Sequence, residues 1–240
     1  DLTNTLLPLL SSEKTMINYL SLKGCNLSDS FASSDGLYKN LSENVALTTL
    51  NLANNQFTDM GLSSICKALK VSPAITEVSL AQNNAEGDCL MDLVGMLAGV
   101  EVSEEEEGVW KSVAKHVGDK NKAVKDANKG RKKKGYSDLP EVATPAERIV
   151  KVDDVNCIAN RTLKTLDLSF CPLAAPTFEK AMRVLQEQKI TEPALDLTLV
   201  VRGRSTDLIV PVPTANPDDA AGEEAKGGEG GSIDGVKLCY

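Results

Sequence analysis

Leucines and polar residues alternate in a fixed order in several separate parts of the chain. The stretch "LKTLDLSFCPL", residues 163–173, follows the pattern L-x-x-L-x-L-x-x-(N/C)-x-L. The pattern recurs, with conservative apolar replacements, as "INYLSLKGCNL" at 17–27, "LTTLNLANNQF" at 47–57 and "ITEVSLAQNNA" at 75–85, and a weaker fifth copy, "EPALDLTLV", occupies 192–200. Because residues two apart face the same side of a strand, each copy predicts a short strand with one buried face.

The last leucine of the L-x-L core in each copy marks the period of the repeat. These leucines are separated by intervals of 30, 28, 88 and 29 residues. Three intervals agree and the long one is close to three periods, so the period and the internal pattern support the repeat independently. We expect the five leucines to be buried at equivalent positions: Leu22, Leu52, Leu80, Leu168 and Leu197.

An apolar stripe with helical spacing follows three of these strands. In residues 58–72, apolar side chains recur three and four positions apart, which predicts a helix with one face toward the strands. The stripes in 58–72, 87–99 and 175–188 consist of Leu62, Ile65 and Leu69; of Leu90, Leu93 and Leu97; and of Phe178, Met182 and Leu185. One strand-helix unit cannot bury its apolar face alone, so neighbouring units are expected to stack around one core.

This combination of pattern and period resembles the leucine-rich repeat family, and the unit length resembles its long, ribonuclease-inhibitor-like subclass. The resemblance implies an α/β solenoid, which is a short arc of strand-helix units with parallel strands on the concave face and helices on the convex face. It also implies that the side chain at the Asn or Cys position bonds backbone groups in the turn after the strand. That position is occupied by Cys25, Asn55, Asn83 and Cys171.

The repeat pattern is absent between residues 100 and 159, and we interpret this stretch as an insertion. Four regions follow: N-terminal repeat units at 1–100, a charged and partly helical insertion at 101–159, C-terminal repeat units with an end cap at 160–210, and a tail at 211–240. Up to Ser232 the tail is rich in Gly, Pro, Ala and acidic residues, a composition that does not fold by itself. Its apolar ending, "IDGVKLCY", predicts a short strand or anchor at the end of the solenoid.

The insertion separates its charges along the chain. The acidic stretch "EVSEEEEGVW" leads into residues 111–129, and its last residue, Trp110, has helical spacing with Val113 and Val117. The basic run "GRKKKG" follows at 130–135. Acidic residues at the start and basic residues at the end suit a helix macrodipole.

The basic run has two interpretations. It is either a charged, flexible loop that keeps the insertion soluble, or a binding or targeting element. Its targets in the second case are nucleic acid, an acidic protein surface or the acidic tails of cytoskeletal filaments, or it is a nuclear localisation signal. Trp110 either staples the helix or docks a partner. The candidate contacts in the insertion are Trp110, Arg131, Lys132, Lys133 and Lys134.

Composition and charge narrow the classes of function. Aromatic residues make up 4% of the 240 residues and hydrophobic residues 42%, so the core is expected to be aliphatic. The formal net charge of −8 argues against a nucleic-acid-binding protein. The sequence contains neither an apolar run long enough to span a bilayer nor a secretory leader. We therefore expect a cytoplasmic protein without membrane contact.

The sequence carries no arrangement typical of a catalytic or metal site. His116 is the only histidine, and no nucleophile motif stands beside it. Neither a phosphate-binding glycine loop nor a dinucleotide motif is present. The six cysteines form no CxxC pair, and we expect them to be free thiols. These observations predict no enzymatic activity, no cofactor, no metal and no small-molecule substrate.

The leading hypothesis is a non-catalytic scaffold for protein-protein interaction, because a rigid curved surface loses little entropy on binding. Short arcs that carry an insertion resemble repeat proteins of large intracellular assemblies, including the cytoskeleton, the cilium and the flagellum. Resemblance leaves two alternatives: a regulator of a small GTPase, similar to the leucine-rich-repeat activators of the nuclear-transport GTPase, or the sensor end of an innate-immunity receptor. The expected contacts are outward-facing strand positions: Tyr19, Ser21, Lys23, Thr49, Asn51, Glu77, Ser79, Thr165, Asp167, Ser169, Asp196 and Thr198.

Overall fold

Short strands alternate with helices along much of the chain. The computed structural model describes residues 6, 10, 17–101, 104–139, 141, 149–152, 155–187, 196–202, 229–233 and 236–239. The repeat units comprise β1 (Tyr19–Ser21), α2 (Asp29–Ala32) and α3 (Asp35–Glu43); β2 (Thr49–Asn51) and α4 (Asp59–Val71); β3 (Glu77–Ser79) and α5 (Leu90–Ala98); β7 (Thr165–Asp167) and α7 (Ala175–Glu187); and β8 (Leu197–Val200). The predicted order of strand and helix is confirmed.

Five strands form one parallel sheet in the order β1-β2-β3-β7-β8. Equivalent residues are paired from unit to unit, so Leu20, Leu50, Val78, Leu166 and Leu199 make one row across the sheet. β3 pairs directly with β7, although the whole insertion separates them in sequence. The described residues between β3 and β7 therefore add no strand to this sheet, and the expected α/β arc is confirmed.

Two C-terminal strands extend the sheet beyond β8. β10 (Val236–Cys239) pairs in parallel with β8, and β9 (Glu229–Ile233) pairs antiparallel with β10. The prediction that the tail does not fold as far as Ser232 is wrong for its last residues. The backbone of β10 supplies hydrogen-bond partners, so a glycine-rich segment can form a strand without a core of its own. Residues 211–228 lie outside the described part of the chain.

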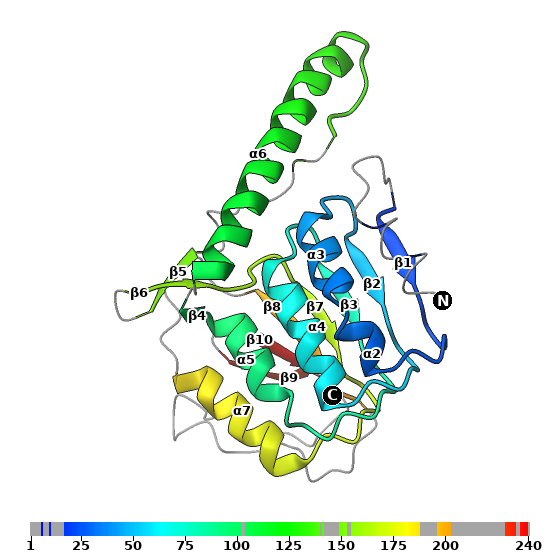
Figure 1. Ribbon diagram of the computed structural model, residues 1–240, viewed down its shortest axis with the longest axis vertical. Helices are drawn as coiled ribbons and strands as arrows, with labels where there is room; N and C mark the ends of the chain where they lie inside the picture. The colour runs from blue at the N-terminus through cyan, green and yellow to red at the C-terminus, as the bar shows by residue number, and fades with distance from the viewer. Residues whose placement is uncertain are drawn as a thin grey trace.

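The core lies between the sheet and the helices. Figure 1 shows α3, α4, α5 and α7 on one side of the parallel strands. A continuous aliphatic cluster joins all the units, with the three phenylalanines Phe31, Phe57 and Phe178 among its buried members. The five leucines that mark the period are all buried, as predicted: Leu22, Leu52, Leu80, Leu168 and Leu197.

The predicted register of the fifth copy is wrong by four residues. Leu199 is paired with Leu166, so Val201, and not Leu197, stands where the previous unit has Leu168. Leu197, Leu199 and Val201 are all buried on the same side of β8. Because side chains in a strand alternate with a period of two, a shift by an even number of residues keeps the same face buried. The leucine pattern alone could not distinguish these registers.

The turns after the strands are held by the residue at the Asn or Cys position. Asn55 Nδ2 donates to the carbonyl oxygens of Leu22 and Leu52, at 2.9 Å in both cases, and Asn55 Oδ1 accepts a hydrogen bond from the Leu27 amide. Asn83 makes the corresponding bonds one unit later. One buried side chain thus connects two units and satisfies backbone groups that stacking removes from water.

The same position is a cysteine in the first and fourth units. Cys171 is buried and its thiol donates to the Leu80 carbonyl oxygen at 3.3 Å, so the expected backbone bond is confirmed there. Cys25 is exposed, and its thiol lies 3.8 Å from the Lys23 carbonyl oxygen in the same turn. The difference follows from the place of each unit, because β1 is the first strand of the sheet.

A second pair of buried asparagines holds the turns that lead into strands. Asn44 Oδ1 accepts hydrogen bonds from the Ala46 and Leu47 amides. Asn160 occupies the same place before β7: its Oδ1 accepts from two following amides, and its Nδ2 donates to the Leu69 carbonyl oxygen at 2.6 Å. Asn160 therefore fixes the point where the chain re-enters the solenoid after the insertion.

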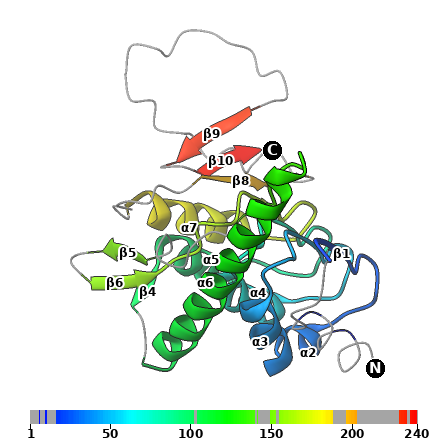
Figure 2. The same cartoon turned by 90° about the horizontal axis from the view of Figure 1, so that it is seen from above.

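The insertion builds a small sheet and one long helix. β4 (Val100–Glu101), β6 (Val155–Ile158) and β5 (Ile149–Val152) form an antiparallel sheet in the order β4-β6-β5. Helix α6 (Glu104–Lys133) leaves this sheet and projects away from the solenoid (Figure 1); in the view from above it lies in front of the solenoid helices (Figure 2). The helix extends beyond the expected residues 111–129 at both ends. The interpretation of the basic run as a flexible loop is wrong, because residues 130–133 form the last turn of α6.

Candidate interaction surfaces

The side of the sheet away from the helices presents two rows of side chains, which we call the open face. The pairing of the strands aligns the two rows residue by residue. The first row consists of Tyr19, Thr49, Glu77, Thr165 and Thr198, and the second of Ser21, Asn51, Ser79, Asp167 and Val200.

Hydrogen bonds hold several open-face side chains in place. Thr49 Oγ1 donates to Glu77 Oε2 at 3.4 Å, and Ser79 Oγ donates to Asp167 Oδ2 at 3.3 Å. Asn51 Oδ1 accepts a hydrogen bond from the backbone amide two residues later, and Asp167 Oδ1 does the same. These bonds reduce the side-chain freedom that a partner would otherwise have to restrict.

The open face is mostly polar and carries negative charge at its centre. Glu77 and Asp167 lie on neighbouring strands β3 and β7. Tyr19 stands at the β1 end of the first row and is 57% exposed, so it offers the one large aromatic surface of this row. The face therefore matches a polar partner surface that supplies hydrogen-bond donors and basic groups.

Three of the predicted contact residues lie outside the paired strands. Lys23 is exposed in the turn after β1, and Asp196 is exposed immediately before β8. Ser169, in contrast, is 4% exposed, and its hydroxyl oxygen accepts a hydrogen bond from the Arg202 amide. The expectation that Ser169 faces outward is wrong, because the following unit covers it and uses it to hold a turn.

Val200 and Phe170 lie on the solvent-facing surface, and the sequence analysis did not predict either of them as a contact residue. Val200 belongs to the open face through its pairing with Asp167. Phe170 is 58% exposed in the turn after β7 and has a φ of 60°. The equivalent turn residues Gly24, Asn54 and Gln82 also have positive φ. Phenylalanine is the bulkiest residue at this left-handed position, where a side chain with a Cβ atom is strained. The position could have been identified from the sequence, because it directly precedes the Asn or Cys of the repeat pattern.

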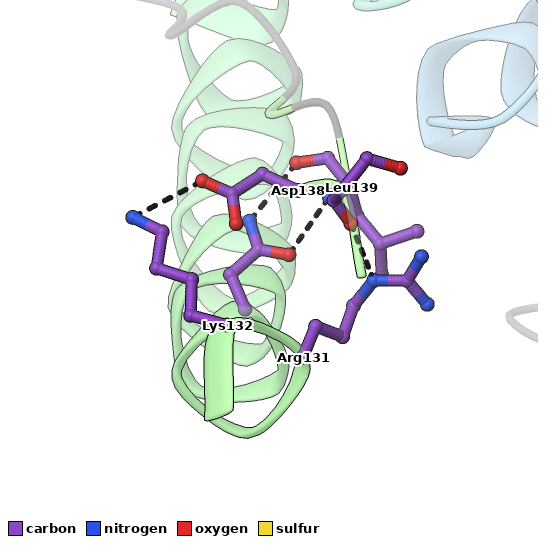
Figure 3. A network of polar contacts seen from close by, with 6 residues as sticks. Arg131, Lys132, Asp138 and Leu139 are labelled. Carbon is purple, nitrogen blue, oxygen red and sulfur yellow. Dashed lines mark hydrogen bonds and ion pairs between the residues drawn. The ribbon is translucent and has the colours of Figure 1, made fainter. Parts of the chain in front are cut away.

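The end of α6 is folded into a compact tip by the residues that return from it. Asn128 Nδ2 donates to the Leu139 carbonyl oxygen at 3.0 Å, and Asn128 Oδ1 accepts from the Leu139 amide at 2.8 Å. Arg131 Nε donates to the Ser137 carbonyl oxygen at 2.8 Å (Figure 3). We call α6 together with residues 134–139 the arm, and the end of the arm, residues 128–139, the tip.

The helix also has a defined C-terminal cap. The Gly135 amide donates to the Lys132 carbonyl oxygen and the Tyr136 amide to the Arg131 carbonyl oxygen. Gly135 has a φ of 74°, the left-handed conformation that ends many helices and that glycine adopts without strain. These hydrogen bonds thus hold the backbone to which the charged side chains of the tip are attached.

The four consecutive cations at the tip differ in their contacts. The Arg131 guanidinium lies 5.6 Å from the centre of the Tyr136 ring, a cation-π contact. Lys132 Nζ forms an ion pair with Asp138 at 3.1 Å (Figure 3). Lys133 and Lys134 are exposed and form no ion pair with a residue that the structure describes. The side chain of Trp110 lies outside the described part of the chain.

Four of the described cysteines, Cys66, Cys89, Cys157 and Cys171, are buried, whereas Cys25 is exposed. Cys25, Cys66, Cys89 and Cys157 are free thiols, as expected. Burial, with a smaller contribution from the Asp92 carboxylate, raises the pKa of Cys66 to about 12, and burial followed by the hydrogen bond to Asp59 raises the pKa of Cys89. Both thiols are therefore protonated at neutral pH and poor nucleophiles.

The described residues offer no metal site and no membrane span. They contain no group of three or more His, Cys, Asp or Glu side chains placed to hold a metal ion. Within the same part of the chain, no helix has the length and apolar character needed to cross a membrane.

The comparison with protein families identifies the repeat. A model described as a leucine-rich repeat matches residues 43–66, which contain β2 and the first part of α4, and residues 159–176, which contain β7 and the start of α7. A comparison with curated proteins gives no significant match. The repeated unit of parallel strand and helix agrees with the two matches: the chain contains leucine-rich repeats at two positions, of a type typical of ribonuclease-inhibitor-like proteins.

Proposed function

We propose that the chain is a non-catalytic interaction scaffold that binds a protein partner on the open face, as a subunit of a larger intracellular assembly. Leucine-rich repeats are in general modules for protein-protein interaction, and the chain contains them at two matched positions. The observation that carries the proposal is the pair of mostly polar rows that cross five parallel strands in register. The partner presents a polar surface with basic groups opposite Glu77 and Asp167.

Crosslinking followed by mass spectrometry of the affinity-purified chain tests this proposal first. We expect partner crosslinks to fall on exposed groups at the rim of the open face, such as Tyr19 and Lys23. Crosslinks confined to α4, α5 and α7 would place the contact on the helices and contradict the proposal. The partner that is recovered is then purified and titrated against variants.

A matched pair of variants makes the titration decisive. Tyr19→Ser with Glu77→Lys changes the open face, and Met60→Ser with Asp88→Lys makes the same kinds of change on the helix side, where both residues are exposed. We expect the first variant to weaken binding about tenfold or more, because one aromatic anchor can carry much of the binding energy of an interface. The second is expected to bind like the wild type. Equal loss in both variants, or loss in the second alone, contradicts the proposal.

The GTPase-regulator alternative predicts a different readout. A regulator of this kind stimulates GTP hydrolysis by its target, whereas a scaffold leaves the hydrolysis rate unchanged. We expect no stimulation when the chain is added to a panel of small GTPases. A stimulated rate that the open-face variant abolishes would replace the scaffold proposal with the regulator.

A further inference from the structure

The outer half of the arm concentrates positive charge in a chain that is acidic as a whole. Residues 119–139 contain eight Lys or Arg and three Asp, a net charge of +5, whereas the formal net charge of the whole chain is −8. The helix of 30 residues is about 45 Å long, and Figure 1 shows it projecting beyond the solenoid. Since exposed charges are screened over about 10 Å in moderate salt, the tip acts as a separate basic site.

Folding uses only part of this charge. Arg131 is bonded to the Ser137 carbonyl oxygen, and Lys132 is paired with Asp138 (Figure 3). These contacts hold the returning segment against α6. Lys133 and Lys134 follow immediately, are exposed, and form no ion pair within the described residues. Two charges at the very end of the arm are thus held at a fixed backbone position and remain available to a partner.

We infer that the tip of the arm, at Lys133, Lys134 and the neighbouring Tyr136, binds an acidic protein segment, which is an extended stretch rich in Asp and Glu. The inference rests on the proposed scaffold function and names a second contact that is separate from the open face. Lysine ammonium groups on flexible stems adapt to several carboxylates without a fixed geometry. The 60% exposed Tyr136 adds an apolar surface beside them.

The same contacts favour a protein segment over nucleic acid or a membrane. Arg131 has the planar fork that suits bidentate recognition of phosphate, but its Nε is bonded to the Ser137 carbonyl and its plane lies near the Tyr136 ring. The large apolar side chains exposed at the tip are Tyr136 and Leu139. Two such residues provide little area for insertion into a bilayer.

A fluorescein-labelled peptide of eight glutamates, titrated with the full 240-residue chain by fluorescence anisotropy, tests the inference. We expect saturable binding in about 0.02 M salt and its loss in about 0.3 M salt, where exposed charges are screened over a much shorter distance. A peptide with glutamine in place of each glutamate is expected not to bind. Equal binding of both peptides, or no binding of the glutamate peptide, overturns the inference.

Two double variants locate the site. Lys133→Glu with Lys134→Glu is expected to weaken binding about tenfold or more while leaving the melting temperature unchanged, because neither side chain holds the tip together. Lys67→Glu with Lys180→Glu changes the net charge by the same amount at exposed positions on α4 and α7, and is expected to bind like the wild type. If the two double variants lose the same affinity, binding depends on overall charge and the assignment to the tip is wrong.

A single variant tests the division between folding and binding charges. Asp138→Asn removes the carboxylate that forms an ion pair with Lys132, so the ammonium group of Lys132 becomes available to the peptide. We expect the glutamate peptide to bind about two- to threefold more tightly, as one additional exposed ion pair allows. Asp88→Asn, which makes the same charge change at an exposed residue outside the arm, is the control. No gain in affinity, or an equal gain in the control, contradicts the division.

Two further probes separate the classes of partner. A single-stranded oligonucleotide of eight bases and vesicles with about one-fifth phosphatidylserine are titrated under the same conditions. Tighter binding of either probe than of the glutamate peptide, lost in the Lys133→Glu, Lys134→Glu variant, overturns the protein-segment assignment. These assays do not require the open-face partner. A failure here therefore leaves the scaffold proposal standing, and failure of the open-face variants leaves the tip inference standing.

Discussion

The repeat units and the arm bury different kinds of groups. In the units, each strand pairs with its neighbours and each helix packs an aliphatic stripe against the sheet, so that side chains such as Leu52 and Ile65 are completely buried. In α6, Val117 is buried, but Asn121 and Asn128 occupy the two other buried positions among the described side chains. The arm also begins and ends with runs of like charge.

This difference separates global from local stability. In a solenoid, stability is approximately a sum over units and the interfaces between neighbours, so loss of one buried group weakens the whole stack. The tip of the arm depends on a glycine cap, a few hydrogen bonds and an exposed ion pair, each of modest strength. Substitutions in the units are expected to change the free energy of unfolding, and substitutions at the tip to change binding.

The largest expected effect comes from Leu52→Ala. Leu52 is 0% exposed between β2 and the helices, and truncation of a buried leucine costs about 2–5 kcal/mol. Leu139→Ala at the tip of the arm, where the residue is 39% exposed, is expected to cost much less. Chemical denaturation measures both. A loss below about 0.5 kcal/mol for Leu52→Ala would mean that the register of the repeat is wrong.

The second expected effect concerns the junction between the two regions. Asn160→Ala removes a fully buried side chain that donates one hydrogen bond and accepts two from backbone amides, and we expect a loss of about 1–3 kcal/mol. Ser72 stands at the equivalent place before β3 and is fully buried, but its hydroxyl has no hydrogen-bond partner among the described residues. Ser72→Ala is therefore expected to be neutral or slightly stabilising. Equal losses in both variants would contradict this account of the turn.

The third effect has the opposite sign. Phe170 holds a φ of 60°, a conformation that costs an ordinary residue about 1–2 kcal/mol and that asparagine tolerates. We expect Phe170→Asn to raise the free energy of unfolding by about 1 kcal/mol. Gln82→Asn, at the same place one unit earlier with a φ of 58°, is expected to show a smaller gain in the same direction. A loss of stability in Phe170→Asn would show that the ring packs against the solenoid.

The smallest effect is a dependence on acidity. Burial alone raises the pKa of Asp59, but hydrogen bonds from the backbone amides of Cys89, Glu86 and Gly87 outweigh it, and the pKa is lowered from its ordinary value of 3.8. A lowered pKa in the folded state contributes stability above the unfolded pKa, and this contribution is lost as the pH falls through the folded value. We expect the wild type to lose more stability than Asp59→Asn between pH 5 and pH 2, both measured by thermal unfolding.

Sequence reasoning predicted the strands and the buried leucines, because these depend on residue spacing within one unit. The resemblance to leucine-rich repeats implied the role of Asn55 and Asn83 in the turns. Sequence reasoning failed where contacts with a second segment of the chain determine the strand register or the burial of a side chain. The register of β8 depends on its pairing with β7, and the burial of Ser169 depends on the backbone of Arg202. Neither contact leaves a periodic signal in the residues around it.

The arm shows the same limit on a shorter scale. The basic run has the composition of a solvated loop, yet Asn128 and Arg131 bond residues that return from Gly135, and these contacts support helix to Lys133. Basic residues favour the C-terminal end of a helix, so the basic run could have predicted a helix end within it. The helix ends at Lys133, four residues beyond the expected end at residue 129. The sequence of four consecutive cations could not show that Arg131 and Lys132 contact the returning segment whereas Lys133 and Lys134 form no ion pair with a described residue.

Hydrogen-exchange mass spectrometry of the wild-type chain tests the separation of solenoid and arm most directly. The Leu52 and Leu80 amides bond across strands inside the sheet, so they are expected to exchange only through global unfolding and at similar rates. The amides of the last two turns of α6 are expected to exchange roughly 100-fold faster, through local opening. Equal protection of the tip and of β2, β3 and β7 would contradict the account, because the arm would then unfold only with the solenoid.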